Sequence, residues 1–185
     1  MVVGMLALVA EPALAKECKG TGVSHPNYAK VNGNKLVLNG MGIREATAFN
    51  VNVYVAALYL PEKTKSASKV INDDVDKKLV LHFVRDVDRS DIVEAWTDSF
   101  KKNGAISSQK AGLIKLNGWM RDMKEGDKMV YTYVPGEGVT ILVKGVNKGT
   151  IEGADFMKAF FKIWFADPPN QGLKDGLLGK IPCED

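Results

Sequence analysis

Hydrophobic and polar residues alternate along residues 28–60, a pattern that is typical of β-strands. Asn-Gly pairs at 32–33 and 39–40 interrupt the alternation and predict tight turns. The run after the second pair, residues 42–60, reads GIREATAFNVNVYVAALYL and has the β-branched and aromatic content of a strand. A further strand is predicted at residues 78–84. This part of the chain therefore predicts a sheet.

The hydrophobic period changes after residue 90. Ile92, Trp96 and Phe100 recur at every fourth position, which predicts an amphipathic helix that begins near Ser90 and stops at Gly104. Similar patterns predict a helix at 113–123, strands at 128–134 and 139–144, a short strand after a turn at 147–149, and helices at 155–164 and 173–178. This order predicts one α+β domain, in which a large antiparallel sheet packs against a layer of helices, with a cleft between the layers.

The composition fits one ordinary globular domain. The chain has 185 residues, of which 45% are hydrophobic, enough for a core that folds without further support. Its 25 basic and 22 acidic side chains nearly balance, and the lysines are scattered along the sequence. Nucleic-acid-binding proteins gather basic residues into a patch, so no nucleic-acid partner is predicted. Nothing in the sequence indicates an oligomeric state.

The first fifteen residues, MVVGMLALVAEPALA, have the features of an export signal. An apolar run at 2–10 precedes Pro12, and small residues occupy the positions that signal peptidase reads at Ala13 and Ala15. The run is too short for a stable membrane span. We therefore expect a signal peptide at 1–15 and a periplasmic or secreted domain at 16–185. The alternative is a buried N-terminal strand or helix.

Two cysteines, Cys18 and Cys183, lie near the two ends of the predicted mature chain. In an oxidising compartment such a pair most simply forms one disulfide that ties the termini together. A metal site is not predicted, because the two histidines, His25 and His82, are far apart along the chain and no further cysteine accompanies either. His82 lies in a predicted strand and is expected to be a half-buried structural residue.

Familiar catalytic motifs are missing from the sequence. There is no Gly-x-Ser-x-Gly elbow and no histidine in a suggestive place, and the glycines of PGEGV at 135–139 lie between two predicted strands rather than in a phosphate-binding loop. No cofactor is predicted. A pair of catalytic carboxylates remains an open alternative, because nothing in the sequence selects one pair.

An arginine, Arg44, opens the strand-like run, and Tyr54 follows ten residues later. In one straight strand the two residues would lie about 33 Å apart, too far to share a ligand. They meet only if the chain turns back near residues 47–50. Tyr54 shares a face of the run with Asn52, whereas the alternate positions are hydrophobic, so a cleft is expected on the tyrosine side.

Several segments together resemble the chalcone isomerase-like family, in its bacterial exported branch. They are GIREATAFNVNVYVAALYL, the helix with Trp96, the hairpin DKMVYTYVPGEGVTILVKG, the turn IEGADF, and IWFADPP before LKDGLLG. The resemblance covers residues 32–179. It implies an open-faced β-sandwich, a large antiparallel sheet against a layer of helices, which agrees with the element order predicted from the hydrophobic pattern.

The resemblance also bears on activity. Plant isomerases of this family stabilise a developing oxyanion with an arginine at the position of Arg44, assisted by a strand threonine and by a helix tyrosine and asparagine. In this chain Tyr54 stands at the threonine position, and the other two fall near Arg89 and Trp96. These changes argue against chalcone cyclisation. An arginine with a strand tyrosine resembles instead the fatty-acid-binding members, in which the pair grips a carboxylate.

The expected function is therefore non-catalytic binding of a hydrophobic carboxylate in a cleft between sheet and helices. Candidates for the wall of the cleft, each also a plausible core residue, are Trp96, Phe100, Leu113, Leu116, Phe156 and Phe160. One alternative is an isomerase or intramolecular lyase in which Arg44 stabilises an oxyanion and Tyr54 donates a proton. Another is an interaction module without a small ligand, in which Arg44 pairs with Glu45 or Asp86.

Overall fold

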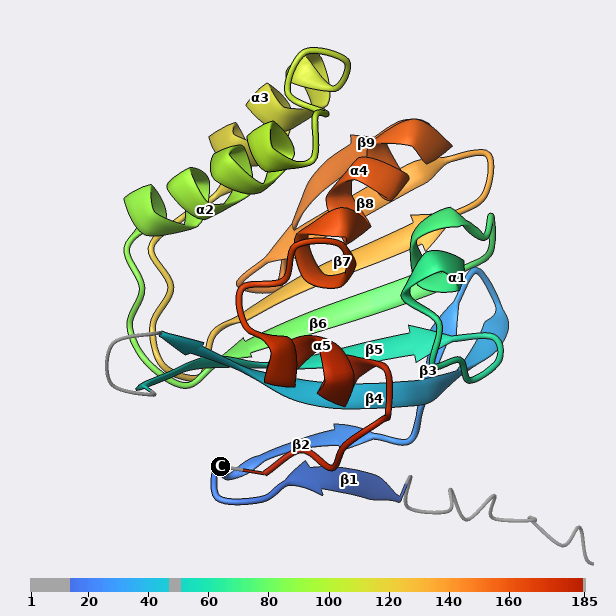
Figure 1. The fold of residues 1–185 in the computed structure, drawn as a ribbon, viewed down its shortest axis with the longest axis vertical. Coiled ribbons are helices and arrows are strands. Elements are labelled where there is room, and N and C mark those ends of the chain that lie inside the picture. The colour runs from blue at the N-terminus through green and yellow to red at the C-terminus, as the bar shows by residue number, and fades with distance from the viewer. Residues whose placement is uncertain (1–13, 47–50, 185) are drawn as a thin grey trace, which may run out of the picture.

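The alternating segments of the sequence form a seven-stranded antiparallel sheet in the computed structural model, which describes residues 14–46 and 51–184 (Figure 1). The strands neighbour one another in chain order, so that each strand between the two edge strands pairs with the strand before it and the strand after it. They are β3 Tyr28–Val31, β4 Asn34–Ala46, β5 Val51–Leu60, β6 Lys77–Phe83, β7 Lys128–Val134, β8 Gly138–Val143 and β9 Val146–Ile151. The predicted α+β class with a large antiparallel sheet is confirmed.

Helices cover one face of this sheet (Figure 1). They are α1 Ala67–Asn72, α2 Arg89–Lys102, α3 Lys110–Trp119, α4 Ala154–Phe165 and α5 Gln171–Leu177. Most residues of α4 are buried, because this helix packs on the sheet and also contacts α1, α2 and α5. The longest helix, α2, spans 14 residues, whereas a bilayer needs about 20 apolar residues, and none of the described helices could cross a membrane.

The α2–α3 helical hairpin is joined to the sheet by two segments that run side by side (Figure 1). Val87 and Met123 pair across these segments through two backbone hydrogen bonds of 2.9 Å. Arg89 strengthens the closure, because its guanidinium donates to the backbone oxygens of Met120 at 3.2 Å and Asn117 at 3.0 Å. The helical hairpin is thus a unit closed at its base.

The sheet separates two hydrophobic cores. The inner core lies between the sheet and the helices, and the outer core lies beneath a small hairpin of β1 Ala15–Cys18 and β2 Val23–Pro26. Because side chains alternate along a strand, β5 serves both cores: Tyr54 and Leu58 face the helices, whereas Val55 and Tyr59 face the outer core. Each face of the sheet is therefore covered by hydrophobic contacts.

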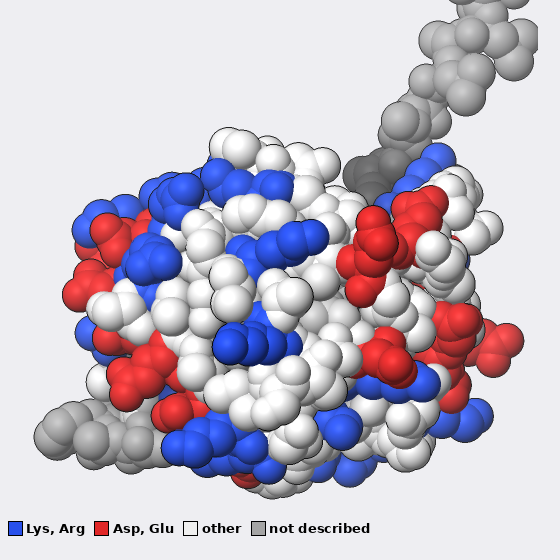
Figure 2. Space-filling view, turned by 90° about the horizontal axis from the view of Figure 1, so that it is seen from above, with Lys and Arg blue, Asp and Glu red and all other residues white. Residues whose placement is uncertain are grey.

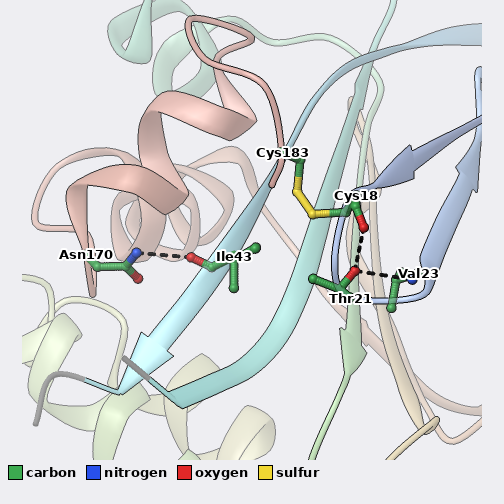
Figure 3. Close-up of a disulfide and its surroundings, with 6 residues drawn as sticks. All are labelled: Cys18, Thr21, Val23, Ile43, Asn170 and Cys183. Carbon is green, nitrogen blue, oxygen red and sulfur yellow. Dashed lines mark hydrogen bonds between the residues drawn. A yellow bond between two sulfur atoms is a disulfide. The ribbon is translucent and has the colours of Figure 1, made fainter. Parts of the chain in front are cut away.

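A disulfide between Cys18 and Cys183 joins β1 to the segment after α5 (Figure 3). The pairing is the one predicted from the sequence. Beside it, the Thr21 hydroxyl donates to the Cys18 carbonyl at 2.8 Å and accepts a hydrogen bond from the Val23 amide at 3.2 Å, which closes the β1–β2 turn. Both ends of the described chain are thereby held on the outer face of the sheet.

Helix α5 packs closely on β4 because glycines face one another there. A side chain at Gly40 would meet the backbone of Gly176, so neither position can carry one without displacement. The turn predicted at 39–40 is wrong: β4 continues through these residues with a β-bulge. The bulge aims Asn39 at the helix, where it donates to the Leu177 carbonyl at 2.7 Å.

Two helix boundaries also differ from the sequence prediction. Asp88, rather than Ser90, is the N-cap of α2. The helix predicted to reach residue 123 ends at Trp119, because the backbone of Met123 pairs instead with that of Val87. Tertiary pairing thus overrides the hydrophobic period at the end of α3.

One predicted turn lies at a different place, and the structure contains a helix and a hairpin that the sequence analysis did not predict. The turn predicted at 147–149 lies inside β9, since the chain reverses at Lys144 and Gly145, both of which have positive φ. Helix α1 and the β1–β2 hairpin were not predicted, because both are short. The predicted signal peptide at 1–15 lies outside the described residues, except for residues 14 and 15.

Charged side chains of both signs are distributed over the face seen in Figure 2. Uncharged surface lies between several of the basic groups, and acidic groups border basic ones at both sides of this face, so there is no continuous basic stripe across it. Three of the five ion pairs of the described residues have both side chains exposed; an example is Lys124 with Asp86 at 2.7 Å. Exposed pairs of this kind contribute little to stability.

Candidate functional site

Arg44 and Tyr54 lie directly opposite each other on neighbouring strands. They are partners in the antiparallel register of β4 and β5, next to a β-bulge between Arg44 and Glu45. Directly opposed residues share a face of the sheet, and Tyr54 belongs to the inner core. Residues 34–46 and 51–60 are therefore two antiparallel strands, which is the arrangement that allows Arg44 and Tyr54 to share a ligand. The alternative, in which both residues lie on one straight strand, is wrong.

The hydroxyl of Tyr54 is held by a tryptophan of helix α4. Trp164 Nε1 donates to Tyr54 Oη at 3.1 Å, and both side chains are buried. An indole N–H can only donate, so the phenol accepts this bond and keeps its own hydrogen. No described residue accepts that hydrogen in the structure. Tyr54 therefore presents a free O–H donor inside the protein.

Burial determines the protonation state of this phenol. Loss of solvent raises the pKa of Tyr54 to about 12, although the Trp164 hydrogen bond and the charge of Arg44 both act to lower it. The effect of Arg44 on the pKa places its positive charge near the phenol. At neutral pH Tyr54 is consequently an uncharged hydrogen-bond donor beside a cation.

Arg44 has a buried nitrogen, Nη1, that lacks a hydrogen-bond partner. Within residues 14–46 and 51–184 it forms no ion pair. The two acids considered as partners are engaged elsewhere: Glu45 accepts from Asn170 at 3.4 Å, and Asp86 binds Lys124. The salt-bridged arrangement expected of an interaction module is therefore absent among these residues.

Asn170 fixes the strand end that carries Arg44. Its side chain donates to the Ile43 carbonyl at 3.0 Å and accepts from the Glu45 amide at 3.3 Å (Figure 3). These bonds replace ladder bonds on the two sides of Arg44 and connect β4 to the N-terminal end of α5. The backbone position of Arg44 is thereby set by the segment that follows α4.

The predicted wall residues all lie in the inner core together with Tyr54. Each is at most 5% exposed, and they are Trp96, Phe100, Leu113, Leu116, Phe156 and Phe160. Trp164 connects them to Tyr54, because its ring contacts Trp96 at a centroid distance of 5.5 Å and Phe160 at 5.0 Å. The structure therefore brings Tyr54 and the six wall candidates together in one core.

The cleft predicted between sheet and helices is filled by side chains in this structure. Aromatic residues of α4 occupy the space, with Phe160 against Tyr131 at 4.7 Å and against Phe156 at 6.0 Å. The two described cavities lie elsewhere: one of about 270 Å³ lies beside Asn27, and one of about 240 Å³ lies near Lys77. A ligand chain in the inner core would have to displace aromatic side chains.

Three residues of the site were not identified from the sequence as functional. Trp164 and Tyr131 have the hydrophobic pattern of core residues, and Asn170 follows two prolines in a predicted loop. The period of these two aromatic residues signalled burial, but no local signal paired the Trp164 indole with Tyr54. The positions that matched other isomerase residues have structural roles: Arg89 binds backbone oxygens, and Trp96 donates to Met120 Sδ at 3.4 Å.

Comparisons with known proteins agree with this architecture. A family model described as chalcone isomerase-like matches residues 16–179. The crystal structure of a fatty-acid binding protein from Arabidopsis thaliana superposes with a TM-score of 0.73 at 15% sequence identity. The alignment covers 90% of this chain and 97% of the plant chain, and at this identity it shows a shared fold. No relative was found among curated protein sequences.

Proposed function

Because the chain belongs to the chalcone isomerase-like family, we propose that it binds a hydrophobic carboxylate, such as a fatty acid, without catalysing a reaction. The observation that carries the proposal is a pair of unsatisfied donors, Arg44 Nη1 and the hydroxyl hydrogen of Tyr54, on directly opposed residues of β4 and β5. A carboxylate has two oxygens and a negative charge, so it can satisfy both donors at once.

Energetics favour an anionic partner at this point. Arg44 is half-buried, and its buried Nη1 has no partner, so the guanidinium gains most from a ligand of opposite charge. Tyr54 adds a neutral donor, and its hydrogen points away from Trp164 because the indole occupies one side of the oxygen. A hydrogen bond to a charged group contributes about 1.5 to 3 kcal/mol, more than one between neutral groups.

The apolar tail of the ligand would enter the inner core between the α2–α3 hairpin and α4. Trp96 meets Trp164 at this boundary, next to the head-group pair. The α2–α3 hairpin is joined to the sheet by two segments only (Figure 1), so a tilt of the whole unit could open the boundary. The buried aromatic side chains would then line the ligand chain.

We also propose an exported location for the protein, in the bacterial exported branch of the family. The disulfide between Cys18 and Cys183 is compatible with an oxidising compartment, and the apolar start of the sequence has the features of a signal peptide. A carrier in such a compartment would hold fatty acids that are otherwise poorly soluble in water.

Catalysis of the isomerase type is the weaker alternative. Arg44 could stabilise an oxyanion, and Tyr54 could donate its free hydrogen. Arg89 and Trp96, near the positions of the helix tyrosine and asparagine of the plant isomerases, do not contribute to such a reaction. Arg89 binds backbone oxygens, and Trp96 donates to a methionine sulfur. Turnover of an enolisable substrate that is lost on Arg44→Ala would favour this alternative over binding alone.

The proposal is tested by thermal melts of delipidated protein with a long-chain fatty acid or with the alcohol of the same length. We expect the acid, but not the alcohol, to raise the melting temperature, because a ligand at 100 times its Kd stabilises by about 2.7 kcal/mol. Arg44→Leu should abolish this rise and leave the unliganded protein at least as stable, since it removes a half-buried cation whose Nη1 has no partner.

Arg85→Leu is the matched control, because Arg85 is an exposed arginine. This variant should keep the full response to the fatty acid. A rise in melting temperature that persists in Arg44→Leu would show that Arg44 does not bind the head group. Equal responses to the acid and the alcohol would show that no carboxylate is recognised.

A further inference from the structure

The two histidines of the chain meet on the outer face of the sheet. His25 belongs to β2 and His82 to β6, and their ring centroids lie 6.2 Å apart with an angle of 89° between the ring planes. Sequence distance suggested that they were unrelated. The β1–β2 hairpin brings them together because it folds back over the centre of the sheet.

Each ring has a buried nitrogen without a partner. These atoms are His25 Nε2 and His82 Nδ1. A buried nitrogen without a hydrogen bond costs about 1 to 3 kcal/mol, so a ligand that bound both nitrogens would remove both costs. Burial lowers the pKa of His25 to about 4, which leaves its ring neutral and able to bind a metal at pH 7.

We propose that His25 and His82 bind one soft monovalent cation, Cu(I) or Ag(I), as a two-coordinate site. An imidazole nitrogen lies about 1.2 Å from its ring centroid and binds a metal at about 2.0 Å, so two rings on one metal in a linear arrangement have centroids about 6.4 Å apart. The observed 6.2 Å fits this value. A tetrahedral angle would bring the rings closer together.

The ligand inventory favours a monovalent ion over zinc. Among residues 14–46 and 51–184, no group of three His, Cys, Asp or Glu side chains could hold a metal, so two imidazoles are the whole protein ligand set. Lys128 lies directly opposite His82 on β7, and its positive charge disfavours a divalent cation more than a monovalent one. Soft ions with linear coordination suit such a site.

Few other groups compete for a soft metal ion. Both cysteines are in the disulfide, so there is no free thiol. The methionines of the described residues are all buried and at most 1% exposed: Met41, Met120, Met123, Met129 and Met157. A bound ion would link the β1–β2 hairpin to the centre of the sheet, and it would add a second cross-link to that of the disulfide.

Titration of the full chain with Ag(I) in chloride-free buffer tests the site, because silver needs no reductant. We expect one ion per wild-type molecule by native mass spectrometry, and at least 100-fold weaker binding in His25→Phe and in His82→Phe. Lys128→Leu keeps both rings, adds no metal ligand and should bind silver several-fold more tightly, because it removes a nearby positive charge.

Imidazole NMR signals of the wild-type protein provide a second measurement that does not depend on a variant folding. Only two histidines exist, and the signals of both should shift with one equivalent of Ag(I). Unshifted signals, or silver binding by His25→Phe and His82→Phe that equals binding by the wild type, would overturn the proposal. A water molecule shared by the two rings would give that result.

Discussion

Tyr54 lies directly opposite Arg44 across the β4–β5 pair and accepts a hydrogen bond from Trp164 at 3.1 Å. The tryptophan therefore decides where the phenol hydrogen can point. Helix α4 thus takes part in the candidate site without supplying a charged group. Arg44 Nη1 and the Tyr54 hydroxyl each have a hydrogen without an acceptor among the described residues, and substitution tests each of them separately.

Tyr54→Phe should weaken fatty-acid binding by about 1 kcal/mol or more, roughly fivefold, because one hydrogen bond to the carboxylate is lost. Unfolding in urea should also show a loss of about 1 to 3 kcal/mol, since Trp164 Nε1 loses its buried acceptor. Tyr28→Phe is the control, because Tyr28 is 49% exposed whereas Tyr54 is 5% exposed. Unchanged affinity in Tyr54→Phe would exclude the phenol from the head-group site.

Removal of the disulfide with Cys18→Ala and Cys183→Ala should lower the free energy of unfolding by up to about 5 kcal/mol, because the bond closes a loop of nearly the whole described chain. Reductant should lower the stability of the wild type and leave that of the variant unchanged. Mass spectrometry after alkylation checks the bond directly. Two alkylated thiols without reductant, in protein taken from the exported fraction, would contradict it.

Gly176→Ala should destabilise the protein by about 2 kcal/mol or more, because the new methyl group would meet the backbone of Met41 and displace α5 from β4. Gly118→Ala is a matched control in helix α3, where a methyl group meets nothing within 4 Å. It should be neutral or stabilise by up to about 1 kcal/mol, as alanine favours helices. Similar urea midpoints for the two variants would show that α5 can shift freely.

The burial of Lys77 predicts that the free energy of unfolding increases as the pH rises from 8 to 10.5. The side chain is fully buried, its Nζ donates to the Asp73 carbonyl at 2.7 Å, and burial lowers its pKa to about 8. Between pH 8 and 10.5 the unfolded chain still holds this proton while the folded protein has released it. Stability therefore rises with pH in this window and is lost again as pH falls toward 8.

The Lys77→Met variant isolates this effect, because it keeps a long apolar side chain and removes the titrating group. The unfolding free energy of the wild type, minus that of the variant, should increase by about 3 kcal/mol or less from pH 8 to pH 10.5. Urea unfolding at several pH values measures the difference. A constant difference over the window would show that Lys77 has an ordinary pKa in the folded protein.

The hydrophobic period of each segment determined most of the strands and helices of this fold. The period of two predicted the strands from residue 28 onward, and the period near four predicted α2 and α4, because burial of one face requires these repeats. The pairing of Cys18 with Cys183 followed from the number of cysteines. These properties depend on the residues of one segment or on their inventory, so the amino-acid sequence alone determines them.

Contacts between distant segments were decided only by the tertiary structure. The sequence showed that Arg44 and Tyr54 meet if the chain turns back, but the register of β4 and β5 placed them opposite each other. The bond from Trp164 to Tyr54 and the meeting of His25 with His82 join residues that no local pattern relates. Such pairs arise when whole elements pack, because side-chain volume and hydrogen bonding then select one arrangement among many with the same periodicity.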